Sequence, residues 1–484
     1  MGGYKYGVYG DIGNTVAQNA LQATETIVYI GTAPINLVRG FDSDLVNKPI
    51  RVTGKSTALR RVGYSKDWVG FTLSEAIAAH FDNALTPIGP IVLINVLDPA
   101  IHKKSSETTV ELQFAAGKAE IVSDTIIIDS LALDSYVEGG DYELEYNYQK
   151  GAVVITSIAT PITGSVTASY SEVDPSLVTH SDIIGEATAD GAYSGIQALT
   201  LVNSLYDLVP SIVLAPTWSE IPEVYNALIS AVRGIGGHWL ADVYADIPVS
   251  TLSDTITKAL SWKAANGYVS EDSKVFWPQG KKGGMQFHLS TLAAVTRLYT
   301  DYQNGGIPYE SPANKQVDVD ELYTGEGARM LTFDQAAANL LTQKGITTSI
   351  RFGGIWRMWG DHTAAYDYDE ATNDPRSAFD INMSMLKYIV NDFQVRFLPD
   401  IDSPLDKNRV ESILASEQEM LDGLKARGAL VGEPRCFFLE ESNDPDDIQG
   451  GRFRWDVTVT ATPPLKAASV SVAYTDAGFS AIFE

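Results

Sequence analysis

The sequence is poor in cysteine and in basic residues, and each shortage excludes a class of protein. One cysteine among 484 residues rules out an intrachain disulfide framework and a cysteine-rich zinc or iron–sulfur site. Lys and Arg total 35 against 61 Asp and Glu, so the formal net charge is −26. Because phosphate backbones repel so acidic a chain, we expect no direct binding of nucleic acid.

Long apolar stretches are missing too. The longest apolar runs, such as Ile91–Ile94, fall far short of the ~20 residues that cross a bilayer. The first residues, Met1–Gly7, lack the apolar core of a signal peptide. We therefore expect no membrane insertion. We also expect the chain to be made in the cytoplasm and either to stay there or to leave within an assembly.

Motifs for catalysis or ligand binding are absent as well. Gly54-Lys55-Ser56 does not complete a phosphate-binding loop, because Pro49 stands where the first glycine belongs. The six histidines show no metal-binding spacing, and the acidic clusters lack the glycine and distant glutamate of a calcium loop. We therefore expect no catalytic residue, no metal ion and no cofactor.

Strands alternate with helices in two parts of the chain, whose length allows about two to four domains. In the first part, apolar strands at Ile27–Gly31 and Ile91–Val96 flank a helix at Ser74–Asn83. From Ser181 the alternation returns and predicts parallel strands with right-handed crossovers. The elements predicted there are strands at Ser211–Pro216, Trp239–Ala245, Lys274–Pro278 and Gly345–Ile350, a helix that Ser219 caps, and a helix at Ser253–Trp262.

Residues 101–180 have a different pattern, in which apolar and polar side chains alternate. Tyr142, Leu144 and Tyr146 alternate with polar residues, and turn residues separate this segment from similar ones. A period of two is typical of strands with one buried face. We interpret this stretch as an all-β module inserted into the α/β domain.

The last part of the chain combines helices with a strand. Helical periodicity covers Ser377–Phe393 and Pro404–Arg427, and a strand is predicted over Arg452–Thr460 before Pro463-Pro464. The apolar face of this strand consists of Phe453, Trp455, Val457 and Val459.

Strand-like alternation also occurs at both ends of the chain. The apolar positions are Tyr4, Tyr6 and Val8 at the N-terminus and Val470, Val472 and Tyr474 at the C-terminus. An isolated strand leaves its backbone N–H and C=O groups without partners. Each end is therefore a disordered tail, a strand on the chain's own sheet, or a strand donated to another subunit. Arms exchanged head to tail would generate rings or helical filaments.

One segment is specific enough to indicate a family. Gly345–Arg351, Gly354 and Trp359–Thr363 together resemble the signature of tail sheath proteins from contractile-tailed bacteriophages. Sheaths of R-type bacteriocins and other contractile injection systems are related to these proteins. Weaker matches occur at Tyr193–Leu199, Pro210–Pro216, Phe276–Pro278 and Pro463–Leu465. The resemblance covers residues 23–100 and 181–484.

The resemblance implies an α/β, or α+β multidomain, architecture. Its parts are a common α/β sheath core, an inserted all-β domain, a C-terminal α+β domain and extended terminal arms. The implied divisions are an N-terminal linking arm (1–22), the core domain in two parts (23–100 and 181–360), an outward-facing insertion (101–180), a C-terminal domain facing the tube (361–464) and a C-terminal linking arm (465–484).

The resemblance also implies a structural protein rather than an enzyme. Sheath subunits stack as helical rings, expected to be six-fold, around an inner tail tube. They contract from a metastable extended state without nucleotide hydrolysis. The implied partners are further copies of the chain, the tube protein, and baseplate and tail terminator proteins. The implied location is a virion tail assembled in the host bacterial cytoplasm.

Within that picture, particular residues receive roles. The exchanged arms would add to the predicted strand that contains Phe453 and Val459. Polar contacts suit a surface that must later slide along the tube. The tube-facing candidates lie at the two ends of the Pro404–Arg427 helix and are Lys407, Arg409, Lys425 and Arg427.

Two other functions remain open from the sequence. An α/β enzyme, such as a hydrolase with an unrecognised site, would need a deep pocket with perturbed carboxylates or histidines. A surface-binding protein would use the insertion at 101–180 to recognise a receptor or a glycan.

Overall fold

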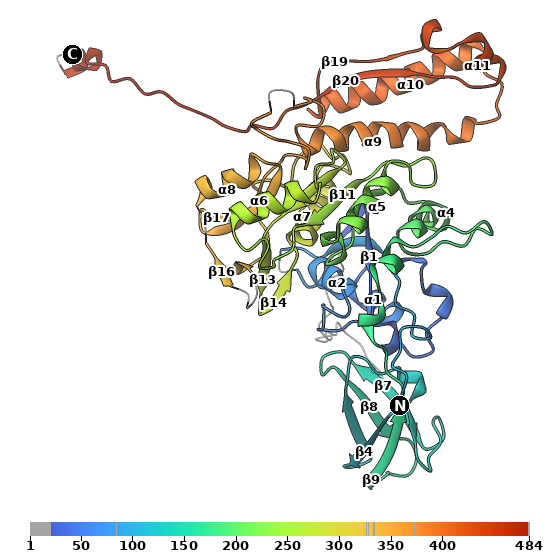
Figure 1. Ribbon diagram of the computed structural model, residues 1–484. Helices are drawn as coiled ribbons and strands as arrows, with labels where there is room; N and C mark the ends of the chain where they lie inside the picture. The colour runs from blue at the N-terminus through green and yellow to red at the C-terminus, as the bar shows by residue number, and fades with distance from the viewer. Residues whose placement is uncertain are drawn as a thin grey trace, which may run out of the picture. The chain divides into compact units, whose positions relative to one another are not determined.

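The computed structural model describes residues 21–83, 85–325, 327, 329–332, 334–370 and 373–482. These residues form two compact units (Figure 1). The first unit extends to Asp402 apart from Tyr309–Ser311, and the second combines Tyr309–Ser311 with the chain from Ser403 onward.

An eight-stranded, mostly parallel sheet forms the centre of the first unit, in the order β18-β17-β12-β11-β10-β1-β3-β2. Only the outer strands β18 and β2 run antiparallel to their neighbours, which confirms the predicted alternation of strands and helices. The strands are β1 (Leu21–Gly31), β2 (Pro49–Val52), β3 (Ile88–Asn95), β10 (Pro210–Leu214), β11 (Asp242–Asp246), β12 (Ser273–Phe276), β17 (Ile346–Phe352) and β18 (Ile355–Trp359). The helices of this unit are α1 (Lys55–Arg61), α2 (Leu73–Phe81), α3 (His180–Ile184), α4 (Leu201–Tyr206), α5 (Pro222–Val232), α6 (Ile256–Ala265), α7 (Leu289–Gln303), α8 (Gln335–Thr342) and α9 (Asp380–Phe397). A smaller antiparallel sheet has the order β14-β13-β15-β16 and consists of β13 (Gln279–Lys282), β14 (Met285–Phe287), β15 (Glu321–Thr324) and β16 (Arg329–Leu331).

The two faces of the large sheet have separate cores, because successive side chains of a strand point to opposite sides. In β1, Val28 and Ile30 belong to the core that contains α5, whereas Ile27 and Tyr29 belong to the core that contains α2 and α7. All four side chains are fully buried. The continuous apolar run of β1 therefore reflects burial on both faces.

Two helix starts differ from the sequence prediction. Ser219 does not cap α5, because its hydroxyl accepts a hydrogen bond from Asp246 N instead. Helix α6 begins at Ile256 rather than at Ser253, because the Thr255 side chain caps it. A local side-chain cap thus sets the start of α6, whereas α5 begins at Pro222 after Ile221 without a side-chain cap.

The inserted module is all-β, as its alternating pattern predicted. It contains two three-stranded antiparallel sheets, β4-β9-β6 and β5-β8-β7, around an apolar core of its own. In β7, Tyr142, Leu144 and Tyr146 are buried, and Glu143 and Glu145 are exposed. The strands are β4 (Thr108–Phe114), β5 (Lys118–Val122), β6 (Ala132–Leu133), β7 (Tyr142–Asn147), β8 (Ala152–Ser157) and β9 (Gly164–Tyr170).

The second unit is an α+β structure. Helix α10 (Lys407–Ala426) packs against a two-stranded antiparallel sheet of β19 (Leu430–Phe437) and β20 (Asp456–Ala461). A short helix, α11 (Pro445–Gln449), lies in the connection between the two strands.

The boundary between the units falls later than the division expected near residue 361. Helix α9 belongs to the first unit. Its Lys387 ammonium lies 2.7 Å from an Asp242 carboxylate oxygen, and its Ser384 hydroxyl donates to Asp242 at 2.6 Å. These bonds hold α9 against the large sheet, so the first unit ends only at Asp402.

Two glycines of the sheath-like segment occupy positions that no larger residue fits. Gly345 precedes β17 with φ +65°, and a Cβ there would lie 2.5 Å from Thr363 O. Gly360 follows β18 with φ +130°, and a Cβ there would lie 3.0 Å from Thr347 Cα. Both the positive φ and the close approach therefore require glycine.

Replacing Gly345 with alanine should lower the free energy of unfolding by about 2–4 kcal/mol, from backbone strain and the clash with Thr363 O. Gly234→Ala is the matched control, because nothing lies within 4 Å of its Cβ position and its φ is not positive. Calorimetry of the two variants should show a lower unfolding midpoint only for Gly345→Ala. Equal midpoints would contradict the requirement for glycine.

Candidate functional site

The segment that resembles sheath proteins forms a buried hydrogen-bond junction. The Lys274 ammonium, whose side chain is 1% exposed, donates to Gly360 O at 3.0 Å and also bonds to Asp380. Lys263 donates to Ala364 O at 2.7 Å, and burial lowers the pKa of Lys263 to about 8. Because buried cations need partners, Lys274 ties the chain after β18 to the sheet and to the start of α9, and Lys263 ties it to α6. The segment thus helps to position α9.

The predicted acceptor strand is shorter than the sequence indicated. Strand β20 begins at Asp456, so Val457 and Val459 lie within it. Phe453 and Trp455 precede it, and their assignment to the strand was therefore wrong. The apolar alternation begins at Phe453, three residues before the first residue of β20 that pairs with β19.

Asn443 explains the late start of β20. Its amide nitrogen donates to Arg454 O at 2.9 Å, and its amide oxygen accepts from Arg454 N at 2.8 Å. A side chain thus occupies the backbone groups that a partner strand would use. Trp455 packs against Phe438 instead, with ring centroids 5.2 Å apart.

Strand β20 presents an open edge. Among the described residues, β20 is hydrogen-bonded to one strand, β19. On the other side of this sheet, Gln418 of α10 donates to Pro434 O at 3.0 Å and accepts from Cys436 N at 3.3 Å. Gln418 therefore covers part of the β19 edge, and the edge of β20 is the better template for an added strand.

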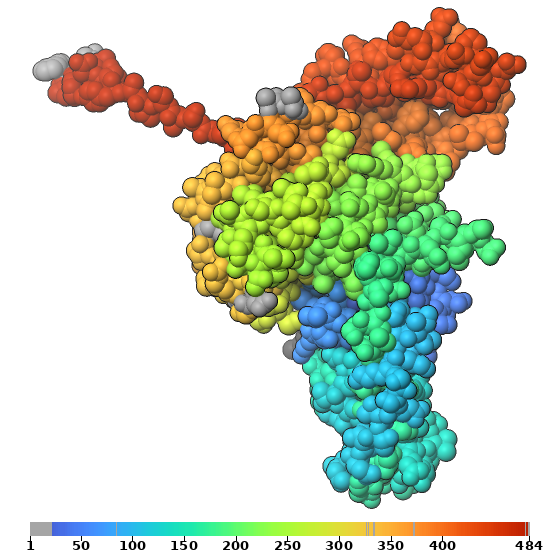
Figure 2. All heavy atoms as spheres, in the orientation of Figure 1, coloured from blue at the N-terminus to red at the C-terminus, as the bar shows by residue number. Residues whose placement is uncertain are grey.

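The segment after β20 forms a narrow, extended stretch near the red end of the colour scale (Figure 2). Val470 and Val472 are each 87% exposed, and Tyr474 is 82% exposed. Residues 462–475 contain no helix or strand. A strand packed on the chain's own sheet is therefore excluded here, and a free tail or a donated strand remains. The N-terminal candidates lie outside the described residues and stay a prediction: Tyr4, Tyr6 and Val8.

The four tube-facing candidates lie at the two ends of α10. Lys407 and Lys425 each pair with a surface glutamate, at 3.7 and 2.9 Å. Arg427 is exposed, and Arg409 is partly buried. Exposed pairs of this kind add little to folding stability, so their cations are not committed to the fold. Contact with a tube stays a prediction for all four residues.

His80 is buried among neutral partners. Its Nε2 lies 2.8 Å from the Tyr29 hydroxyl, and its Nδ1 lies 3.0 Å from Ile88 O. A neutral imidazole satisfies both, because Nδ1–H donates to the carbonyl and Nε2 accepts from the hydroxyl. Burial accordingly lowers the pKa of His80 to about 4.

His288 is buried between carboxylates. Its Nδ1 lies 2.7 Å from Glu75 Oε2, and its Nε2 lies 3.4 Å from Glu220 Oε1. Burial opposes the charged imidazole, but Glu75, Glu220 and nearby Asp246 together raise the pKa of His288 well above its usual value. Burial also raises the pKa of Asp246 to about 7. Both imidazole nitrogens face carboxylates, so His288 serves as a buried ion-pair partner.

The two histidines should lower the free energy of unfolding in opposite pH ranges, His80 below pH 6.5 and His288 above it. His80 binds a proton more readily in the unfolded chain, so it should cost about 3 kcal/mol of stability as the pH falls from 6.5 to 4. His288 holds its proton more tightly when folded, so its contribution is present below pH 6.5 and is lost as the pH rises above it.

Denaturant titrations across this pH range would check both effects. His80→Gln should remove most of the loss of stability that His80 causes between pH 6.5 and 4, and His288→Gln should remove the loss that His288 causes above pH 6.5, so each variant is the reference for the other. A wild-type profile that either variant leaves unchanged would contradict the assigned charge states.

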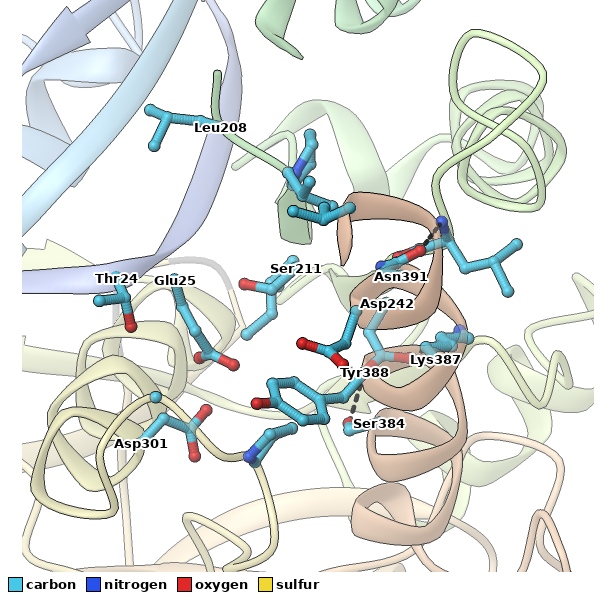
Figure 3. Close-up of a pocket in the computed structure, with 18 of the residues that line it drawn as sticks. Thr24, Glu25, Leu208, Ser211, Asp242, Asp301, Ser384, Lys387, Tyr388 and Asn391 are labelled. Carbon is cyan, nitrogen blue, oxygen red and sulfur yellow. Dashed lines mark hydrogen bonds and ion pairs between the residues drawn. The ribbon is translucent and has the colours of Figure 1, made fainter. Parts of the chain in front are cut away.

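A pocket of about 370 Å³ in the first unit contains charged residues that the sequence analysis did not single out (Figure 3). Among them are Glu25 of β1, Arg297 and Asp301 of α7, and Lys387 of α9. Arg297 and Asp301 lie four residues apart on α7, a spacing that is visible in the sequence. Glu25 lies in the mostly polar stretch Gln22–Thr26 before the apolar run of β1, so nothing in the sequence set it apart.

In the part of the chain that the structure describes, no group of three or more His, Cys, Asp or Glu side chains could hold a metal ion. No helix of the same residues is long and apolar enough to cross a membrane.

No family model matches this chain. Individual proteins are similar to it over nearly its whole length. Its sequence is 26% identical to the tail sheath protein of Burkholderia phage BcepMu over 480 residues, which covers 93% of this chain and 96% of that protein. Its fold is similar to a chain of the PVC sheath complex, an extracellular contractile injection system in the contracted state. That match has a TM-score of 0.56 at 12% identity and covers 98% of this chain and 99% of the other. A chain of the anti-feeding prophage baseplate matches with a TM-score of 0.55 at 14% identity, over 97% and 98% of the two chains. The resemblance to contractile tail sheath proteins is therefore confirmed, by sequence with a phage protein and by fold with injection-system structures.

Proposed function

We propose that this chain is the subunit of a contractile tail sheath. Copies polymerise as helical rings, six to a ring, around an inner tail tube. Contraction from a metastable extended state drives the tube through a host cell envelope and consumes no nucleotide. The observation that carries this proposal is the similarity to a phage tail sheath protein over nearly the whole of both chains.

The second unit contains the two parts that a link between copies needs. Strand β20 has an edge without a described partner strand, and the segment after it has alternating apolar residues exposed to water. When the C-terminal segment of one copy adds to the β20 edge of the next, both sets of backbone groups gain hydrogen bonds. The contact is head to tail, so it propagates into a helical array.

The strength of such a link follows from the buried groups. Full burial of a valine side chain contributes about 1.5–3 kcal/mol, and each added backbone hydrogen bond contributes about 1 kcal/mol. With a single cysteine in the chain, several disulfides between successive copies are not available. Backbone pairing can therefore hold copies together while the rings rotate into a tighter packing.

The proposed partners are further copies of the chain, the tube protein, and baseplate and tail terminator proteins. The tube-facing role is assigned to Lys407, Arg409, Lys425 and Arg427. The protein acts in a virion tail assembled in the bacterial cytoplasm, without catalysis, membrane insertion or nucleic-acid binding. The phage protein that matches this chain is named as a tail sheath protein, and the PVC structure as a sheath complex, which supports this setting.

The net charge of −26 bears on how stable the array is. The same negative charge repeats in every copy, so subunits repel one another unless opposite charges pair across their interfaces. Exposed arginines beside β20 are candidates for such pairs. Arg452 and Arg454 bond to Asp447 and Asp456 within the single chain, at 2.6 and 2.9 Å, and the exposed arginine side chains can exchange such partners readily.

The double substitution Val470→Asp and Val472→Asp should prevent polymerisation. In an added strand these two residues share one face, which would bury two carboxylates against the neighbouring copy. Electron microscopy and sedimentation velocity should find no tubes under conditions in which the wild-type chain forms them.

The matched control is Ser469→Asp with Ser471→Asp, which adds the same charge on the opposite face of the segment. This variant should still form tubes. Both variants should unfold at the wild-type temperature, because the substituted residues are exposed in the single chain. Tubes formed by the valine variant, or their equal loss in both variants, would contradict strand exchange.

A further inference from the structure

The pocket in the first unit has the features of a small-ligand site. Its volume of about 370 Å³ lies in the usual range for such sites. Residues 208–210 and Val395 contribute apolar groups to its wall. Figure 3 shows the carboxyl groups of Glu25 and Asp301 turned toward one another, with the Tyr388 hydroxyl nearby.

The cations of the pocket already have carboxylate partners. Arg297 Nε donates to Asp301 Oδ2, and its Nη2 donates to Pro308 O at 3.3 Å. Lys387 Nζ lies 2.7 and 2.9 Å from the carboxylates of two aspartates. Both cations that line the pocket are therefore paired with aspartates, and neither is left to pair with Glu25.

A proton takes the place of the missing cation. Asp301 Oδ1 is buried and receives no hydrogen bond from an ordinary N–H or O–H donor of the described residues. Burial and the adjacent Asp301 raise the pKa of Glu25 well above its usual value. A neutral Glu25 can donate a hydrogen bond to Asp301, so the pair can hold one proton between its two carboxyl groups.

We propose that this pocket binds an alkyl cation, that is, an ammonium or guanidinium group on an aliphatic stem, in exchange for the proton between Glu25 and Asp301. The cation bonds to the carboxylate that Glu25 becomes, and the proton leaves to solvent. The stem lies along the apolar wall. The charged groups that line the pocket with Glu25 leave an excess of negative charge, which favours a cation: Asp207, Asp242, Asp301, Asp392, Arg297 and Lys387.

Calorimetric titration of the full chain with butylguanidinium would test this site. Measurements at pH 7 in two buffers of different ionisation enthalpy report the number of protons released. The wild-type chain should bind one cation and release close to one proton. Glu25→Gln keeps the shape of the side chain but cannot ionise, so it should bind about ten- to a hundredfold more weakly and release no proton.

Glu186→Gln, in an exposed loop, is the matched control and should behave as the wild type. Uncharged butylurea should not bind the wild-type chain. Absence of saturable butylguanidinium binding would overturn the proposal. The proposal would equally be overturned if Glu25→Gln bound butylguanidinium as tightly as the wild type. It would also be overturned if the wild-type chain released no proton on binding.

The cation can be a free alkyl cation or a Lys or Arg side chain of a second copy, and self-association distinguishes them. If a second copy supplies it, Glu25→Gln and added butylguanidinium should both weaken self-association of the full chain in sedimentation velocity. If both leave self-association unchanged, the ligand is a free alkyl cation. The calorimetric result stands on the single chain, so it can succeed or fail independently of the sheath function.

Discussion

A strand persists only when its backbone N–H and C=O groups have partners, and the C-terminal part of this molecule depends on that constraint. The β19–β20 sheet has two strands, which is too few to be stable without further packing. Helix α10 supplies part of that packing, and Gln418 covers part of one edge. The β20 edge has backbone groups without a described partner strand, and the segment Val470–Tyr474 has exposed apolar side chains and no strand beside it. Pairing between two copies of the chain can satisfy both.

The first unit is organised differently, because it contains its own apolar cores and pairs its most deeply buried cations within the unit. Its central sheet is buried on both faces, and the Lys274 and Lys263 ammonium groups fasten the segment that follows β18. Because close-packed interiors do not deform gradually, we expect such a unit to move as one body. In a contracting array, the change would then fall on interfaces between copies while each subunit keeps its fold.

The sequence predicted the elements that repeat a simple pattern. The apolar run of β1 and the alternation of Tyr142, Leu144 and Tyr146 both led to strands that the structure contains. Where a single side chain decided the outcome, pattern was not enough. Asn443 bonds to the backbone of Arg454 and delays β20, although the apolar alternation extends back to Phe453.

The candidate sites likewise include one that a local sequence pattern predicted and one that no such pattern could predict. The exposed alternation at Val470, Val472 and Tyr474 was visible in the sequence, because a local pattern defines it. The pairing of Glu25 with Asp301 was not, because it joins residues far apart in the chain through the topology of the sheet. The sequence pattern also could not locate the end of the first unit. Bonds between α9 and Asp242 determine that boundary.

The most direct test of sheath assembly by strand exchange is a cryo-electron microscopy map of the polymer formed by the full chain. The account predicts that residues 470–474 of one copy lie beside β20 of a neighbouring copy as an added strand. A polymer in which this segment contacts only its own copy, or a chain that stays monomeric at high concentration, would contradict it.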